Sequence, residues 1–395
     1  MKKPENNLKK ALPLYMISIL QGITFTLMPS ASQFLTSPQG LNLSSQMYGF
    51  LFIPMVAAAI LVSFLCALFS GKIRYQSIFI VISLCNLCGL GLFAVTGFLH
   101  ANIFLTCVIL MAFLGAGFGG MISLLNPIVY TLFSDKASSA ITALHACLGV
   151  GTAIGPLLFS LSLKIGFFWF DPALLIGLFA ILVPLAALRI RGISQSGVQK
   201  YKKDSKSLSQ LCFITFSAIA FIYGYIETTF GNWGIMYLFK EKNFSYLDAS
   251  LALSIFWFFV TLGRVLVAVI TTRISSHWIY RSLPLLILIS LTFLQKAVSS
   301  NSFYISFALA GLGCSCFLPL TISLASLNYP LQASKVSGIL MALYLSGYAF
   351  ASEGVALLQK YLNVSVGEIY LYTIAPIILL LYLTSRATQW VDCNH

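Results

Sequence analysis

The sequence predicts an all-α membrane protein with twelve transmembrane helices arranged as two six-helix bundles. Composition is the first observation behind this, because 59% of the 395 residues are hydrophobic and only 8% are charged. Soluble domains carry about 25% charged residues. Length is the second, because apolar runs of roughly 20 residues match a hydrocarbon core of about 30 Å in helical form. Charge placement is the third, since the charged residues fall mostly between these runs.

The first expected span follows a basic N-terminal segment that contains Lys2, Lys3, Lys9 and Lys10. Its apolar run is too long for the core of a signal peptide, so we expect an uncleaved first span. Each later span is an apolar run bounded by a short polar or basic segment, and helices alone satisfy the backbone groups of such runs in lipid. The expected spans cover residues 11–35, 46–70, 76–98, 103–133, 138–163, 171–190, 209–238, 248–272, 279–297, 302–326, 334–359 and 366–385.

Loops that are rich in lysine and arginine alternate along the chain with loops that are poor in them. The rich loops hold the N-terminal lysines, Lys72, Arg74, Lys136, the central loop, Arg273, Arg281, Lys335 and Arg386, and the poor loops hold Lys164, Lys240, Lys242, Lys296 and Lys360. The richer set is expected in the cytoplasm, which places both termini there and favours a bacterial inner membrane. This distribution accounts for the net charge of +13 without a nucleic-acid partner. We expect contact with the lipid bilayer and a monomer.

The longest polar stretch divides the chain near its middle. It runs from Arg189 to Ser209 and is rich in lysine and arginine. We expect a basic cytoplasmic linker over residues 191–208, between an N-terminal bundle over 1–190 and a C-terminal bundle over 209–395. Secondary transporters use such halves, with the cargo site near the bilayer midplane between them.

Motifs for metals, nucleotides and enzymatic chemistry are not found in the sequence. Cys85 and Cys88, like Cys314 and Cys316, lie inside expected spans, so they are interpreted as packing residues and not as zinc ligands. The chain has no Walker loop, which excludes direct drive by ATP. We therefore predict no cofactor, no metal and no enzymatic activity. Three Asn-x-Ser tripeptides begin at Asn42, Asn243 and Asn363, a number that chance explains.

Several stretches resemble a known family. They are Gly117-Phe118-Gly119-Gly120 with Asn126-Pro127, Leu144-His145-Ala146 with Gly149, Gly151, Gly155 and Pro156, Tyr223 with Glu227 and Trp233, and Gly263-Arg264 with Arg273. The layout resembles the major facilitator superfamily, and these stretches resemble its fucose–proton symporter branch. The resemblance implies two six-helix bundles and alternating access.

The sequence departs from that branch at three places. Gly71-Lys72-Ile73-Arg74 keeps the basic residues of the loop between spans two and three but lacks its acidic residue. The branch protein carries carboxylates in spans one and four, where this chain has Phe25 and Ile122. Fucose transport by that coupling scheme is therefore not expected.

Four ionisable residues lie well inside the expected spans: His145, Glu227, Arg264 and Glu353. A charge at the bilayer centre costs at least about 2.5 kcal/mol, so such residues usually face a cavity or a partner. Glu227 has the richest polar and aromatic surroundings, including Tyr223, Asn232 and Trp233. We expect this carboxyl to carry a coupling proton, with a buried structural acceptor as the alternative.

The other three have competing interpretations. His145 is a candidate proton relay, because the ordinary pKa of histidine is about 6.5, or else a packing residue. Arg264, with Arg273, either gates the cytoplasmic side by donating to carbonyls or a carboxylate, or binds an anionic cargo. Glu353 lines the cavity or belongs to an outer gate, with a vestibule carboxylate in contact with water as the alternative.

Neutral hydrogen-bonding side chains complete the candidate substrate-binding set, which also contains Tyr223, Asn232, Trp233 and Glu353. Gln21 and Thr24 in span one and Asn126 in span four would suit the hydroxyls of a sugar, or they link helices to one another. We expect a proton-coupled secondary transporter of a small polar solute. The alternatives are an exporter of amphipathic compounds and a membrane sensor that transports nothing.

Overall fold

The computed structural model describes residues 4–69, 73–99, 101–133, 137–181, 210–271, 273–329 and 332–393, which are helical apart from short connections and contain no strand. The first half contains α1 Pro4–Thr36, α2 Ser45–Phe50, α3 Phe52–Phe69, α4 Tyr75–Thr96, α5 Ile103–Leu132, α6 Ala137–Lys164 and α7 Asp171–Ile181. The second half contains α9 Gln210–Met236, the π-helix η2 Tyr237–Glu241, α10 Tyr246–Ile270, α11 Ser276–Lys296, α12 Ser300–Cys314, α13 Phe317–Asn328, α14 Ala333–Leu362, α15 Val366–Tyr372 and α16 Ile374–Cys393.

The chain separates into two compact units, Met1–Gln199 and Lys200–His395. The expected linker over 191–208 lies outside the described residues, as do Lys72, Lys136 and residues 182–190 of the sixth expected span. Eleven helical stretches in the described part of the chain are long and apolar enough to cross a membrane, and Asp171–Ile181 is a shorter apolar helix. Large apolar side chains such as Leu61, Phe64 and Phe179 are exposed on these helices. Such surfaces suit a lipid solvent, which does not repel them as water does.

Three of the expected spans, 46–70, 302–326 and 366–385, match apolar stretches long enough to cross a membrane, and each consists of two helices with a short break between them. The chain breaks at Leu51 between α2 and α3, at residues 315–316 between α12 and α13, and at Thr373 between α15 and α16. A proline follows each break, namely Pro54, Pro319 and Pro376. Proline has no N–H to donate to the carbonyl four residues earlier and clashes with it. Prolines also lie inside α1, α5, α6 and α11, so a proline alone does not decide where a helix ends.

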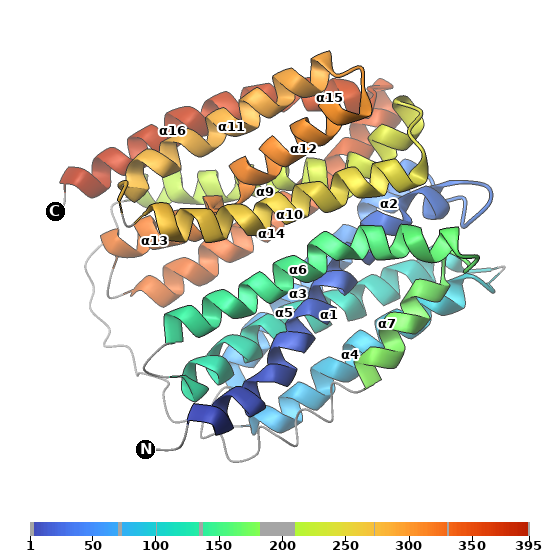
Figure 1. Ribbon diagram of the computed structural model, residues 1–395, viewed down its shortest axis with the longest axis horizontal. Coiled ribbons are helices and arrows are strands. Elements are labelled where there is room, and N and C mark those ends of the chain that lie inside the picture. The colour runs from blue at the N-terminus through green and yellow to red at the C-terminus, as the bar shows by residue number, and fades with distance from the viewer. Residues whose placement is uncertain are drawn as a thin grey trace. The chain divides into compact units, whose positions relative to one another are not determined.

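Each unit contains one pair of helices that cross at facing glycines. In the first unit, α1 packs along α6, and a Cβ on Gly22 or Gly151 would overlap backbone atoms of the other helix. In the second unit, α9 packs along α14, and a Cβ on Gly224 or Gly347 would overlap a backbone carbonyl of its partner. The α1 and α6 pair runs side by side in Figure 1. Small residues at such contacts let helix backbones approach closely.

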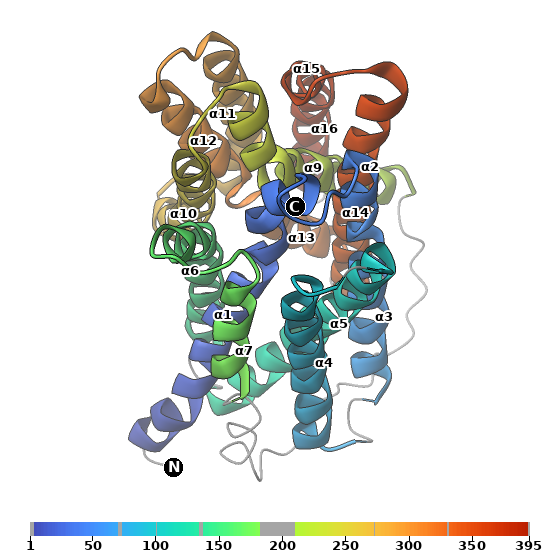
Figure 2. The same cartoon turned by 90° about the vertical axis from the view of Figure 1, so that its right-hand side faces the viewer.

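The apolar core of the first unit lies where α1, α4, α5 and α6 meet. Leu14, Phe79, Ile128 and Leu144 are among its buried members. Figure 2 shows α4 beside α5, which supply much of this cluster.

Three connections between helical segments share one turn, in which an asparagine with positive φ lies two residues before the serine that caps the next helix. Asn42, Asn243 and Asn363 have φ values of 50°, 55° and 52°, in the left-handed region that asparagine tolerates better than most residues. The serines that follow, Ser44, Ser245 and Ser365, accept backbone N–H groups at the starts of α2, α10 and α15. Both ends of the turn are therefore specified by the sequence.

Candidate functional site

The side chain of Glu227 lies in the interior of the second unit, with 2% of its surface exposed. Its Oε1 lies 2.6 Å from the Tyr223 hydroxyl one turn earlier on α9, and its Oε2 accepts the Tyr344 hydroxyl of α14 at 2.5 Å. The rings of Tyr223 and Tyr344 stack with centroids 5.6 Å apart. Two tyrosine hydroxyls thus hold the carboxyl from both sides.

The glycine crossing of α9 and α14 explains why these groups meet. Gly224 abuts the backbone of Tyr344, and Gly347 abuts the backbone of Phe221. Because side chains four residues apart share a helix face, Tyr223 and Glu227 point the same way from α9. The close backbone approach then brings the Tyr344 hydroxyl within hydrogen-bonding distance of the carboxyl.

The break between α12 and α13 also contacts this cluster, after α9 and α14. The Tyr223 hydroxyl lies 2.8 Å from the carbonyl oxygen of Cys314, the last residue of α12. Arg264 of α10 donates its Nε hydrogen to the next carbonyl, that of Ser315, at 3.0 Å. Pro319 has no N–H to offer the Ser315 carbonyl. Side chains from α9 and α10 therefore bind two successive carbonyls at a broken helix.

A second polar group lies further along the same pair of helices. The Asn232 amide donates to Ser352 Oγ at 2.8 Å and accepts the Tyr348 hydroxyl at 2.8 Å. Trp233, the next residue on α9, is fully buried. Glu353 follows Ser352 on α14 and is half-buried. The structure thus places the Tyr223 hydroxyl against the Glu227 carboxyl and links Asn232 to α14 by hydrogen bonds.

The remaining expected site residues lie apart from this cluster or in the other unit. Arg273 follows α10 and is exposed, while His145 on α6 and Asn126 on α5 are half-buried in the first unit. The Oδ1 atom of Asn126 is buried and has no hydrogen-bond partner among the described residues. His145 follows Leu144, whose carbonyl accepts the Ser18 hydroxyl of α1 at 2.8 Å.

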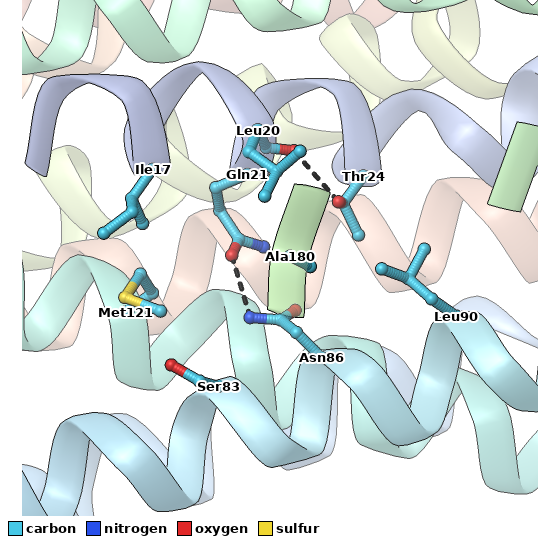
Figure 3. Close-up of a pocket in the computed structure, with 9 residues that line it drawn as sticks. All are labelled: Ile17, Leu20, Gln21, Thr24, Ser83, Asn86, Leu90, Met121 and Ala180. Carbon is cyan, nitrogen blue, oxygen red and sulfur yellow. Dashed lines mark hydrogen bonds between the residues drawn. The ribbon is translucent and has the colours of Figure 1, made fainter. Parts of the chain in front are cut away.

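Gln21 and Thr24 lie on a face of α1 that is buried within its own unit. Gln21 Oε1 accepts the Asn86 amide of α4 at 3.1 Å, and Figure 3 shows the two side chains pointing toward one another. They line a cavity of about 10 Å³ with Ser83, Met121 and other residues, which is close to the space that one water needs. Gln21 Nε2 and Asn86 Oδ1 are buried without a hydrogen-bond partner in the described part of the chain.

A larger apolar groove of about 690 Å³ lies between α9, α14 and α16 in the second unit. Phe221, Tyr225, Phe350 and Tyr361 supply aromatic walls. Its volume falls within the range of small-molecule sites, roughly 300–1,000 Å³.

Sequence reasoning missed Tyr344, Tyr348, Asn86 and the Cys314 carbonyl. The signal for the tyrosines was present, because Tyr344, Tyr348 and Ser352 repeat every four residues and must share one face of α14. No sequence signal identifies a backbone carbonyl as an acceptor. Among the described residues, no group of three or more His, Cys, Asp or Glu side chains could hold a metal ion, and the described cysteines are free thiols.

Comparisons with known proteins agree with this architecture. The model of the Major Facilitator Superfamily matches residues 12–352, while no curated protein matches the sequence. A bacterial homologue of the human lysosomal transporter Spinster, in an inward-facing and occupied conformation, is 15% identical with a TM-score of 0.78, and the match covers 98% of each chain.

Two further solved structures have the same fold. A mutant of the nucleoside transporter NupG is 11% identical with a TM-score of 0.77, over 96% of this chain and 99% of its own. The POT family transporter PepTSo is 10% identical with a TM-score of 0.78, over 100% of both chains. The predicted fold class is thereby confirmed. With the family model matched over most of its length, the chain belongs to the major facilitator superfamily and is a multi-pass membrane transporter, not an enzyme.

Proposed function

We propose that the chain is a proton-coupled secondary transporter of a small polar solute, with Glu227 as the group that carries the coupling proton. The buried carboxyl of Glu227, held by the hydroxyls of Tyr223 and Tyr344, is the observation that carries the proposal. Carboxylates inside membrane spans are expensive and usually serve ion or proton pathways. Tyrosine hydroxyls can donate to the ionised form and accept from the neutral form, so the site can hold either.

A neutral polar solute such as a sugar is the cargo class that the sequence resemblance favours. Resemblance to the fucose–proton symporter branch supports this, and the proposed binding set is Gln21, Thr24, Asn126, Tyr223, Asn232, Trp233 and Glu353. Because Phe25 and Ile122 replace carboxylates of that branch, the proton would move through Glu227, with His145 as a relay. We propose symport across a bacterial inner membrane by a monomer.

An amphipathic cargo is the second candidate, and the aromatic groove of about 690 Å³ between α9, α14 and α16 favours it. Apolar walls with few polar groups suit the hydrocarbon part of such a compound. Export would then replace uptake as the direction of transport.

Transport by the purified protein in liposomes that contain a pH-sensitive dye tests both candidates. Sugars, nucleosides and amphipathic amines are added in turn, and acidification inside the vesicles reports solute-driven proton entry. Glu227→Gln should abolish the proton signal but leave exchange of labelled cargo intact, because the amide cannot ionise. Active accumulation that survives Glu227→Gln would remove Glu227 from the coupling step.

Glu241→Gln is the matched control, since it changes a carboxylate at the end of the same helical segment. The Glu241 carboxylate accepts the backbone N–H groups of Val366 and Gly367 at 2.7 and 2.9 Å. It therefore caps α15, and this variant should transport protons with cargo as the unmodified protein does.

A further inference from the structure

The hydroxyl of Tyr223 faces two acceptors but has one hydrogen to donate. Glu227 Oε1 lies 2.6 Å away and the carbonyl oxygen of Cys314 lies 2.8 Å away. A backbone carbonyl can only accept. Both short contacts are full two-centre hydrogen bonds, with no shared hydrogen, only if the carboxyl itself donates from a proton on Oε1 to the Tyr223 oxygen. With Glu227 neutral, the chain of donation runs from Glu227 to Tyr223 to Cys314.

Ionisation of Glu227 changes this order. The proton on Oε1 leaves to water, and both carboxylate oxygens then only accept. The Tyr344 hydroxyl already donates to Oε2, so Tyr223 is the donor available to Oε1. Hydrogen bonds to an ionised acceptor are roughly twice as strong as neutral ones. The hydrogen of Tyr223 therefore turns to the carboxylate and leaves the Cys314 carbonyl.

We propose that Tyr223 transmits the protonation state of Glu227 to the break between α12 and α13, by binding the Cys314 carbonyl only while Glu227 is neutral. Tyr223 is then a positioning residue that links the proton to a helix hinge. This inference rests on the proposed function of Glu227 and adds the element that responds to the proton.

The break is suited to respond because its carbonyls depend on side chains. Tyr223 binds Cys314 and Arg264 binds Ser315, on either side of the turn that separates the two helices. With the first contact gone, the Cys314 carbonyl would lose its Tyr223 donor, while Arg264 would still bind the Ser315 carbonyl. Buried carbonyls that lack a donor are costly, so the turn should open toward water.

Other titratable and charged groups near the carboxyl are accounted for. Tyr344 and Tyr348 face it from α14, Cys314 from α12 and Arg264 from α10. Tyr348 donates to Asn232 and Arg264 donates to Ser315. Among the described residues, Tyr223 has a hydroxyl within hydrogen-bonding distance of both the Glu227 carboxyl and a carbonyl of the helix break.

Two native thiols at the break serve as reporters. Cys314 and Cys316 are 0% and 6% exposed, and Cys107 of α5 is 1% exposed in the other unit. The full-length protein in detergent is pulsed with N-ethylmaleimide, and mass spectrometry gives the alkylation of Cys314 and Cys316 relative to Cys107. Variants are compared at the same pH, which removes the intrinsic pH dependence of thiol reactivity.

The relative alkylation should rise several-fold between acidic and alkaline pH in the unmodified protein. Glu227→Gln should keep it low throughout, because the amide donates to the Tyr223 oxygen as the neutral acid does. Tyr223→Phe should keep it high throughout. Tyr280→Phe, which removes a buried hydroxyl 2.7 Å from Thr321 Oγ1 on α13, should behave as the unmodified protein.

A pH response that persists in Glu227→Gln overturns the proposal, as does a Tyr223→Phe protein that matches the unmodified one. Should Tyr223→Phe fail to fold, the comparison of Glu227→Gln with the unmodified protein still decides. Because the readout needs no cargo, a lost alkylation response with intact proton coupling contradicts this inference alone. Lost coupling with an intact response contradicts only the proposed function.

Discussion

Arg264 shows how one side chain can serve a helix that proline has interrupted. Its Nε hydrogen meets the Ser315 carbonyl at 3.0 Å, the acceptor that Pro319 cannot satisfy. The sequence left two roles for this residue, gating by donation to a carbonyl or carboxylate, and binding of an anionic cargo. The observed contact is of the first kind, and gating remains a prediction.

Replacement of Arg264 should separate the two roles. Arg264→Ala leaves the Ser315 carbonyl without its donor, which costs about 1–3 kcal/mol for a buried acceptor. We expect faster labelling of introduced cysteines from the cytoplasmic side with unchanged equilibrium affinity for cargo. Arg264→Lys should show the same effect, since lysine keeps the charge but lacks the fixed donor geometry.

Arg281→Ala is a suitable control, because the Nε of Arg281 donates to Thr388 of α16 and not to the helix break. A selective loss of affinity for anionic solutes in Arg264→Ala, with unchanged labelling, would favour the binding role instead.

Helix pairs carry the next level of organisation, and the crossing of α9 with α14 determines whether the carboxyl site can form. A Cβ on Gly347 would overlap the Phe221 carbonyl. The hydrogen bonds of Tyr344 to Glu227 and of Tyr348 to Asn232 depend on that close approach. Tyr344 lies less than one turn before Gly347, and Tyr348 directly follows it.

Gly347→Ala should therefore lower the midpoint of thermal unfolding, since overpacking typically costs about 1–3 kcal/mol. Gly338→Ala on the same helix is the matched control, because a Cβ there meets nothing within 4 Å. It should leave the midpoint unchanged or raise it slightly, as alanine favours helices by up to about 1 kcal/mol over glycine. Equal midpoints for the two variants would show that the crossing tolerates a methyl group.

Across the whole molecule, the distribution of basic residues predicts that both termini lie in the cytoplasm. Fusion of a reporter that is fluorescent only in the cytoplasm to either terminus should give fluorescent cells. A periplasmic phosphatase fused to the same points should be inactive. The opposite pattern at one terminus would mean an odd number of crossings.

The sequence was sufficient for the helical class, because long apolar runs have no other stable form in lipid. It also pointed to Glu227, since a carboxylate inside a span is conspicuous, and to Tyr223, which the structure places against that carboxyl. It did not predict the break at residues 315–316 because prolines elsewhere lie within intact helices. What distinguishes Pro319 is the pair of donors from α9 and α10 that binds the nearby carbonyls. Those donors come from distant parts of the chain, which local patterns do not reveal.

The three turns that begin at Asn42, Asn243 and Asn363 bear on how such tripeptides are interpreted in other membrane proteins. Asparagine tolerates the positive φ of the turn, and the serine hydroxyl caps the next helix. The same two residue types at the same spacing form the acceptor signal for N-linked glycans. Tight connections between helices can thus create apparent glycosylation signals through backbone geometry alone. A count of such signals in short loops therefore measures turn formation as much as modification.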